Sequence, residues 1–158
     1  MAQWYESLTR QMALAAATAW TDVEEVIRPE QLGRRNFQRD IEDAQLHPPF
    51  AVLRVGTAVS ATEYAGDGIP LRVAVTIWRV EDWQGAGGDQ TTDVFGQCAT
   101  LLSWLHNNYL PDMVVEMHRG VAIDASTSTL GELQRILHAG LPFAVASLTV
   151  SVITGSRN

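Results

Sequence analysis

The chain has 158 residues, of which 46% are apolar and 18% are charged, values typical of one globular domain and unlike those of disordered or fibrous chains. All 11 basic residues are arginine, and 18 acidic residues bring the net charge to −7. An acidic chain without a basic run lacks the surface that holds nucleic-acid phosphates. The single cysteine, Cys98, excludes an intrachain disulfide and a cysteine-rich zinc site. We expect residues 1–158 to form a single domain.

The N-terminal third predicts one helix and one short strand. Apolar residues recur there at the three- and four-residue spacing of a helix: Tyr5, Leu8, Met12, Ala15, Ala16 and Ala19. Val23–Ile27 is short and predicts a strand, which Pro29 ends because proline offers no N–H group to a ladder. Residues 29–48 are polar and charged, and we expect a long excursion with one or two helical turns.

Two strands are predicted next, Phe50–Val55 and Leu71–Val80, joined by a polar loop through Ala65–Gly68. This arrangement favours an antiparallel ribbon. The second strand alternates, which places two sets of side chains on opposite faces. The first set is Leu71, Val73, Val75 and Ile77, and the second is Arg72, Ala74, Thr76 and Trp78.

The C-terminal half contains the strongest helical pattern. After the Gly85–Asp89 loop, an apolar stripe runs through Val94, Phe95, Cys98, Leu101, Leu102, Leu105 and Tyr109, and Pro111 ends it. We then expect a strand at 113–121, a short helix at 130–137 and a long strand at 144–153. These elements predict an α+β fold, with an antiparallel or mixed sheet of four to five strands and two main helices packed on one face.

No catalytic constellation is present in the sequence. The histidines, at positions 47, 106, 118 and 138, lack the HExxH spacing of a helical zinc site. The loop Gly85–Gly88 lacks the ending of a P-loop, and the hydroxyl-rich segment Ser126–Thr129 lacks the GxSxG pattern. We therefore assign no catalytic residue, cofactor or metal, although a small α+β enzyme or ligand-binding domain using Gly85–Gly88 and Asp124 remains an alternative.

The tryptophans and arginines of the second predicted strand are better candidates for function. Trp78 and Arg72 point away from its apolar face, and an aromatic or apolar second face needs a cover. Because aromatic residues and arginine are enriched in interface cores, we take Trp78, Arg79, Trp83 and Arg72 as candidate subunit contacts. The alternative is that another helix of the same chain covers them.

The order of these elements resembles that of the tail terminator, or tail completion, proteins of long-tailed bacteriophages. The resemblance rests on an N-terminal helix, a poorly patterned excursion, the segment Pro48–Val55, a long-looped hairpin into Val73–Trp78, a strong helix at 91–109 and a β-rich end. It covers most of the chain as an order of elements, and segments 29–48 and 124–140 are where this chain departs from it.

The resemblance implies a structural protein rather than an enzyme. Such proteins form a hexameric ring that caps the tail tube, stops its polymerisation and docks to the connector or stopper of the head, while genomic DNA passes through the lumen without specific binding. An acidic lumen would repel phosphates and let DNA slide. A head-side neck or stopper protein is the alternative within the same class.

The expected location follows from the same observations. The N-terminus has no basic segment of a secretory leader, and no apolar stretch approaches the roughly 20 residues that span a bilayer. We expect a protein that folds in the host cytoplasm, has no membrane partner and ends in the tail or neck of the virion.

Overall fold

The computed structural model describes residues 3–29, 36, 39–40, 43, 45–60, 70–83, 89–108, 121–138 and 140–155. Its elements are, in order, α1 (Gln3–Ala19), β1 (Val26–Ile27), β2 (Phe50–Ser60), β3 (Pro70–Asp82), α4 (Asp89–Asn108), β4 (Val121–Leu130), β5 (Gln134–His138) and β6 (Leu141–Gly155). The fold is α+β, as predicted. Its sheet has six strands, one more than the upper number expected, and is mixed.

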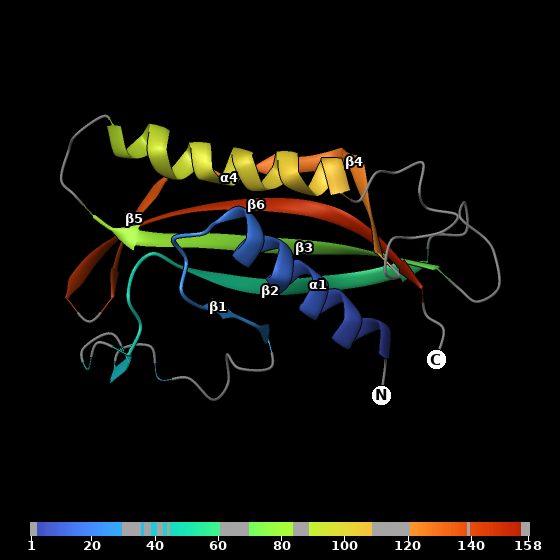
Figure 1. Cartoon of the computed structure of the whole chain (residues 1–158), viewed down its shortest axis with the longest axis horizontal. Helices are drawn as coiled ribbons and strands as arrows, with labels where there is room; N and C mark the ends of the chain where they lie inside the picture. Colours follow the sequence, from blue (N-terminus) through green and yellow to red (C-terminus); the bar gives the residue numbers. More distant parts are fainter. Residues whose placement is uncertain are drawn as a thin grey trace.

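Strand β6 is the centre of this sheet. The strand order is β1-β2-β3-β6-β4, with β5 also paired to β6 (Figure 1). One edge of β6 pairs with β3 along the whole of that strand, and its other edge pairs first with β5 and then with β4. Every pairing is antiparallel except the short one between β1 and β2. The predicted ribbon of two antiparallel strands is therefore confirmed as β2 and β3.

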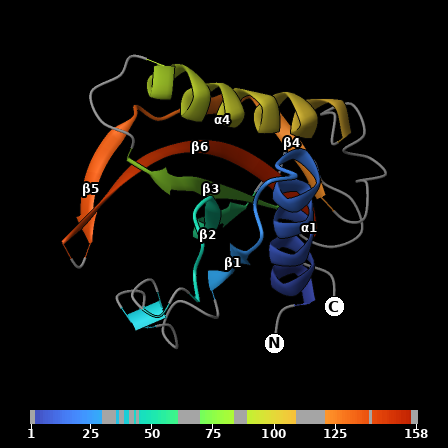
Figure 2. The same ribbon diagram turned by 60° about the vertical axis from the view of Figure 1, so that its left-hand side comes forward.

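The main core lies between one face of the sheet and the two helices. The predicted alternation of β3 is confirmed, because Val73, Val75 and Ile77 are fully buried. Leu148 and Val150 of β6 are buried beside them, and α1 and α4 pack on the same face (Figure 2). Both helices thus cover one face, as expected. Among the described residues of the predicted apolar stripe in α4, four are buried, Leu102 is half-buried and Phe95 is exposed; the buried ones are Val94, Cys98, Leu101 and Leu105.

The prediction of a helix at 130–137 is wrong, because this segment completes strand β4 and forms strand β5. As a strand, β5 pairs with β6 along its whole length. This pairing outweighs a local preference for helix. A two-residue turn joins β5 to β6, in which Gly140 has a φ of +79°. Between β4 and β5, the N–H of Gly131 donates to the carbonyl of Ser147 at 2.7 Å. A Cβ at Gly131 would displace the Ser147 hydroxyl from its present position.

The opposite face of the sheet has a smaller core at one end. Ile27, Leu46 and Phe50 are buried there, with two partly buried valines against them, Val52 and Val80. The predicted strand at 23–27 is reduced to Val26–Ile27. Most of the predicted excursion at 29–48, the loops at 65–68 and 85–88, Tyr109, Pro111 and nearly all of the predicted strand at 113–121 lie outside the described residues. No helix in the described ranges is long and apolar enough to cross a membrane.

We expect Gly140→Ala to lower the free energy of unfolding by about 1 kcal/mol, because a residue with a Cβ is strained at positive φ. Gly96→Ala is the matched control, since Gly96 lies in α4 with open space around its would-be Cβ. In a helix the same change raises stability by about 0.5–1 kcal/mol. Urea unfolding followed by tryptophan fluorescence measures both. Equal effects of the two changes would contradict the assigned turn.

Candidate functional site

Strand alternation divides the four candidate contact residues between two sides of the sheet. Trp78 and Arg72 lie on the face opposite the helices, and both are half-buried. Arg79 is 2% exposed. It lies on the helix side of the sheet, on the same face of β3 as the buried Ile77. Trp83, just beyond β3, packs against the helix-side core. Arg79 therefore lies on the opposite face of β3 from Trp78, because neighbouring residues of a strand face opposite ways, and it is buried within its own chain.

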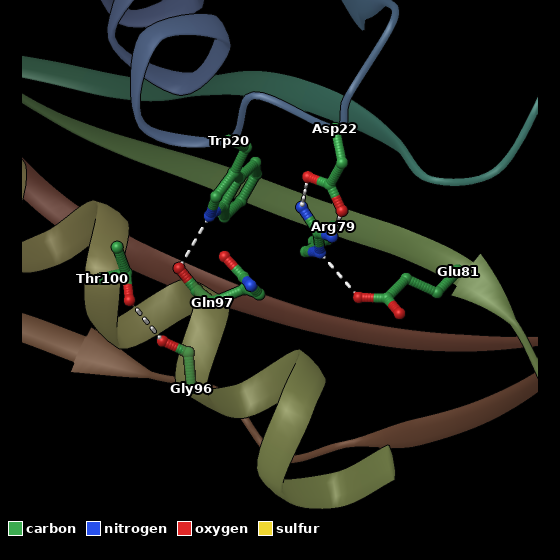
Figure 3. Close-up of polar contacts among 7 residues, drawn as sticks. All are labelled: Trp20, Asp22, Arg79, Glu81, Gly96, Gln97 and Thr100. Carbon is green, nitrogen blue, oxygen red and sulfur yellow. Dashed lines mark hydrogen bonds and ion pairs between the residues drawn. The ribbon is translucent and has the colours of Figure 1, made fainter.

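The buried guanidinium of Arg79 is the centre of a polar cluster (Figure 3). Its Nη1 and Nη2 donate to the two carboxylate oxygens of Asp22 at 3.1 and 2.5 Å. Its Nε donates to Glu81 at 2.6 Å. Asp22 follows α1, and Glu81 shares β3 with Arg79. The fork of the guanidinium thus joins the segment after α1 to the middle of the sheet, in the bidentate geometry that arginine favours.

Trp20 connects this cluster to the second helix. The Cζ atom of Arg79 lies 5.3 Å from the centre of the Trp20 ring, within the range of a cation–π contact. The Nε1 of the fully buried Trp20 donates to the carbonyl of Gln97 in α4 at 2.6 Å. Three elements that are distant in the sequence therefore meet around Arg79. We define Trp20, Asp22, Arg79 and Glu81 as the arginine cluster.

The electrostatics of the arginine cluster favour fixed charges rather than proton transfer. The hydrogen bonds from Arg79 lower the pKa of Asp22 below its ordinary value of 3.8, against the opposing effect of burial. Burial alone would lower the pKa of Arg79, but the hydrogen bonds to Asp22 and Glu81 outweigh it and the pKa is raised. Burial also raises the pKa of the nearby Cys98 thiol to about 12. At neutral pH this thiol is protonated and is not a nucleophile.

The face of the sheet opposite the helices presents a different kind of surface. The Cζ of Arg54 lies 5.3 Å from the centre of the Trp78 ring. The hydroxyls of Thr76 and Thr149 are hydrogen-bonded across the strands at 3.0 Å. Among the described residues of β2, β3 and β6, the charged side chains on this face are Arg54, Arg72 and Asp82. We call Arg54, Arg72, Thr76, Trp78 and Thr149 the open sheet face.

Sequence reasoning missed a second surface, at the turn between β5 and β6. Three large apolar side chains are exposed there: Ile136 at 41%, Leu137 at 61% and Leu141 at 42%. The helix expected at 130–137 hid this feature. A glycine between two β-rich runs, as in the segment Ile136–Leu141, is the signal that predicts a hairpin.

Sequence reasoning also missed one contact involving a hydroxyl. His106, near the end of α4, lies with Nε2 3.3 Å from the Oγ of Ser128 in β4. No group of three or more metal-ligating side chains occurs among the residues that the structure describes. The contact between His106 and Ser128 links helix α4 to strand β4.

Comparisons with known proteins leave the family open. No protein-family model matches the sequence. A search of curated proteins finds no significant match either. Any assignment of function therefore depends on the residues, the fold and the resemblance in element order.

We expect Asp22→Asn to lower the free energy of unfolding at neutral pH by about 1–2 kcal/mol, the lower part of the range for a charged hydrogen bond because Asp22 is half exposed. The pKa of Asp22 is lower in the folded chain than in the unfolded one. Its ionic contribution is therefore present above pH 3.8 and is lost as the pH falls through the folded value. The difference between wild type and variant should shrink over that range, as acid titration of urea unfolding would show.

Asp43→Asn is the matched control for this prediction. Asp43 is paired with Arg39 at 3.4 Å, and its side chain is 51% exposed against 54% for Asp22. Because Arg39 is 76% exposed rather than buried, this pair contributes little. An Asp43→Asn variant as unstable as Asp22→Asn would show that burial of the arginine is not what matters.

Proposed function

We propose that this chain is a structural, non-enzymatic subunit of a phage tail, which forms a ring that caps the tail tube, stops its polymerisation and offers the surface for head joining. Its partners are further copies of itself, the tail-tube protein and the connector or stopper of the head. Genomic DNA passes through the lumen without specific binding. Its place is the tail or neck of the virion, reached after folding in the host cytoplasm.

The observation that carries the proposal is that the helices cover only one face of the sheet among the described residues. Both helices lie on one face, and the open sheet face holds a tryptophan and two arginines with no described helix over them. Aromatic residues and arginine are the types that dominate the cores of protein interfaces. A sheet face of this composition supports contact with another protein better than binding of a small molecule, which needs a concave site.

Two further observations support the proposal. The elements on which the resemblance rests are present in the expected order: α1, the β2–β3 ribbon, α4 and a β-rich end. The titratable side chains of the arginine cluster are committed to one another, which is the arrangement of a structural centre rather than of a general acid or base.

We expect the purified chain, mixed with polymerising tail-tube protein of the same phage, to shorten the tubes and to occupy one end of each. Trp78→Asp should abolish this capping while the chain stays folded, because Trp78 lies outside the main core and its substitution places a charge on the open sheet face. Negative-stain electron microscopy measures the tube lengths, and circular dichroism checks the fold.

Phe95→Asp is the control, since Phe95 is 37% exposed on α4 and lies away from the open sheet face. It should cap as wild type does. Tubes that grow to full length with the wild-type chain present would sink the proposal. If the chain binds the connector but not the tube, the neck or stopper role replaces it.

A further inference from the structure

Strand β5 is the outermost strand at the end of the sheet far from α1 (Figure 2). Four successive side chains of this strand, from Gln134 to Leu137, are exposed. Because successive side chains of a strand point to opposite faces, both faces of β5 are open to solvent. Two of these side chains, Ile136 and Leu137, are large and apolar, one on each face. A strand that is apolar on both faces needs cover on both faces.

The backbone of β5 also has polar groups that point away from the sheet. The N–H of Trp83 donates to the carbonyl of Pro142 at 3.3 Å, so this carbonyl points to the side of β6 that carries β3. In an antiparallel pair, two opposite residues point their N–H and C=O groups either at each other or away from each other. Leu137 lies opposite Pro142, so its N–H and C=O point to the outer edge of β5. Arg135, two positions earlier, has the same direction.

The outer edge of β5 therefore presents the N–H and C=O groups of two residues, Arg135 and Leu137. No described strand pairs with this edge, and such an edge can accept a strand of another chain. A second β5, antiparallel to the first and centred on Ile136, would place each Arg135 opposite the Leu137 of the other copy. Both of these pairs are of the hydrogen-bonded kind, so this register satisfies all four outward groups of each copy.

The side chains of β5 suit the same register. Ile136 meets Ile136 of the other copy in a non-hydrogen-bonded pair, the kind in which side chains come closest. Each Arg135 lies beside the Leu137 of the other copy, on the same face of the joined sheet, and not directly opposite the other arginine. The methylene stem of an arginine can cover an apolar neighbour while its charge stays in water. The second strand thus covers exposed apolar groups on both faces.

The charges favour a second copy of this chain as the partner. All 18 acidic residues precede position 133, so the hairpin of β5 and β6 is free of them. Two copies of net charge −7 repel each other least where their acid-free parts meet. The Cζ of Arg135 lies 5.8 Å from the centre of the Trp83 ring of its own chain. The arginine is therefore held on its own sheet, which makes it a poor lure for an acidic partner.

We propose that two copies of this chain pair through the outer edges of β5, antiparallel about Ile136, so that their two sheets become continuous. The contact joins one surface to itself, so it is two-fold and makes a pair of copies. A ring needs a contact between two different surfaces. The pairing through β5 therefore goes beyond the proposed function and does not depend on it.

A cysteine at the centre of the contact tests the pairing directly. Ile136→Cys should form an interchain disulfide on oxidation with copper phenanthroline, because the two Cα atoms of a non-hydrogen-bonded pair lie about 4.5 Å apart, within the reach of a disulfide. Non-reducing gel electrophoresis over a series of protein concentrations measures the rate. The native Cys98 is buried and its raised pKa keeps it protonated, so it does not interfere.

Leu141→Cys is the matched control, since Leu141 is 42% exposed against 41% for Ile136. It lies on β6, so in the proposed pair its two copies are about three strand spacings, or about 14 Å, apart. Leu137→Cys is a second control: Leu137 is more exposed than Ile136, at 61%, but it faces Arg135 of the other copy. Both controls should form the interchain disulfide at least about tenfold more slowly than Ile136→Cys.

An exchange of charges tests the register. Leu137→Arg places two arginines opposite each other at both ends of the contact, and like charges directly opposite destabilise strand pairing. Sedimentation velocity over a concentration series should show the apparent association constant of the pair fall about tenfold or more. Adding Arg135→Glu to the same chain should restore pairing, because each new glutamate then lies opposite a new arginine. Phe95→Asp, exposed on α4, should pair as wild type does.

Every other outcome overturns the contact. A wild-type chain that stays monomeric up to its solubility limit does so, and a strand of another protein is then the better candidate for the edge. Control cysteines that form the disulfide as fast as Ile136→Cys also overturn it, and these mild changes keep the test valid if circular dichroism shows the charged variants to be unfolded. A chain that does not pair but still caps tubes leaves the proposed function standing. Pairing without capping leaves only the contact.

Discussion

The buried guanidinium of Arg79 is stabilised by two carboxylates and one aromatic ring. The carboxylates of Asp22 and Glu81 neutralise Arg79 and accept its hydrogen bonds, and the ring of Trp20 lies over its Cζ atom. A buried charge without such partners would cost several kcal/mol. The position of the segment after α1 is therefore fixed relative to β3, and the bond from Trp20 to α4 fixes the second helix as well. These contacts link both helices to the same face of the sheet.

Periodicity was enough to predict most of the fold, because the long elements have strong local patterns. The alternation of β3 and β6 and the stripe of α4 correspond to buried residues in the structure. The same alternation separates Arg79 from Trp78, so the correct side of Arg79 was available from the sequence. Its partner Asp22 was not, because the two lie 57 positions apart and no local pattern connects them. Segment 130–137 was misassigned because so short an apolar run does not distinguish a helix from a strand, although Gly140 after it marks the turn of a local hairpin.

The two faces of the sheet have different roles. The helix side holds the apolar core and the arginine cluster, and its charges are satisfied inside the chain. The opposite side holds hydroxyls, arginines and Trp78, with only a small core at one end. The core on the helix side is complete within the chain, whereas no described helix covers the opposite face. That division suits a subunit that folds alone and assembles later.

The central position of β6 has a consequence for how the chain folds. Thr76 and Thr149, which meet across β3 and β6, are 73 residues apart, so the middle of the sheet closes through one of the longest loops in the molecule. Folds dominated by such distant pairings reach the native state in about milliseconds to seconds, much more slowly than helical bundles. Until β6 is made, β3 has an unsatisfied edge during synthesis. The nascent chain therefore passes through a stage at which an interior strand is open to mispairing, and the speed of its last step decides between folding and aggregation.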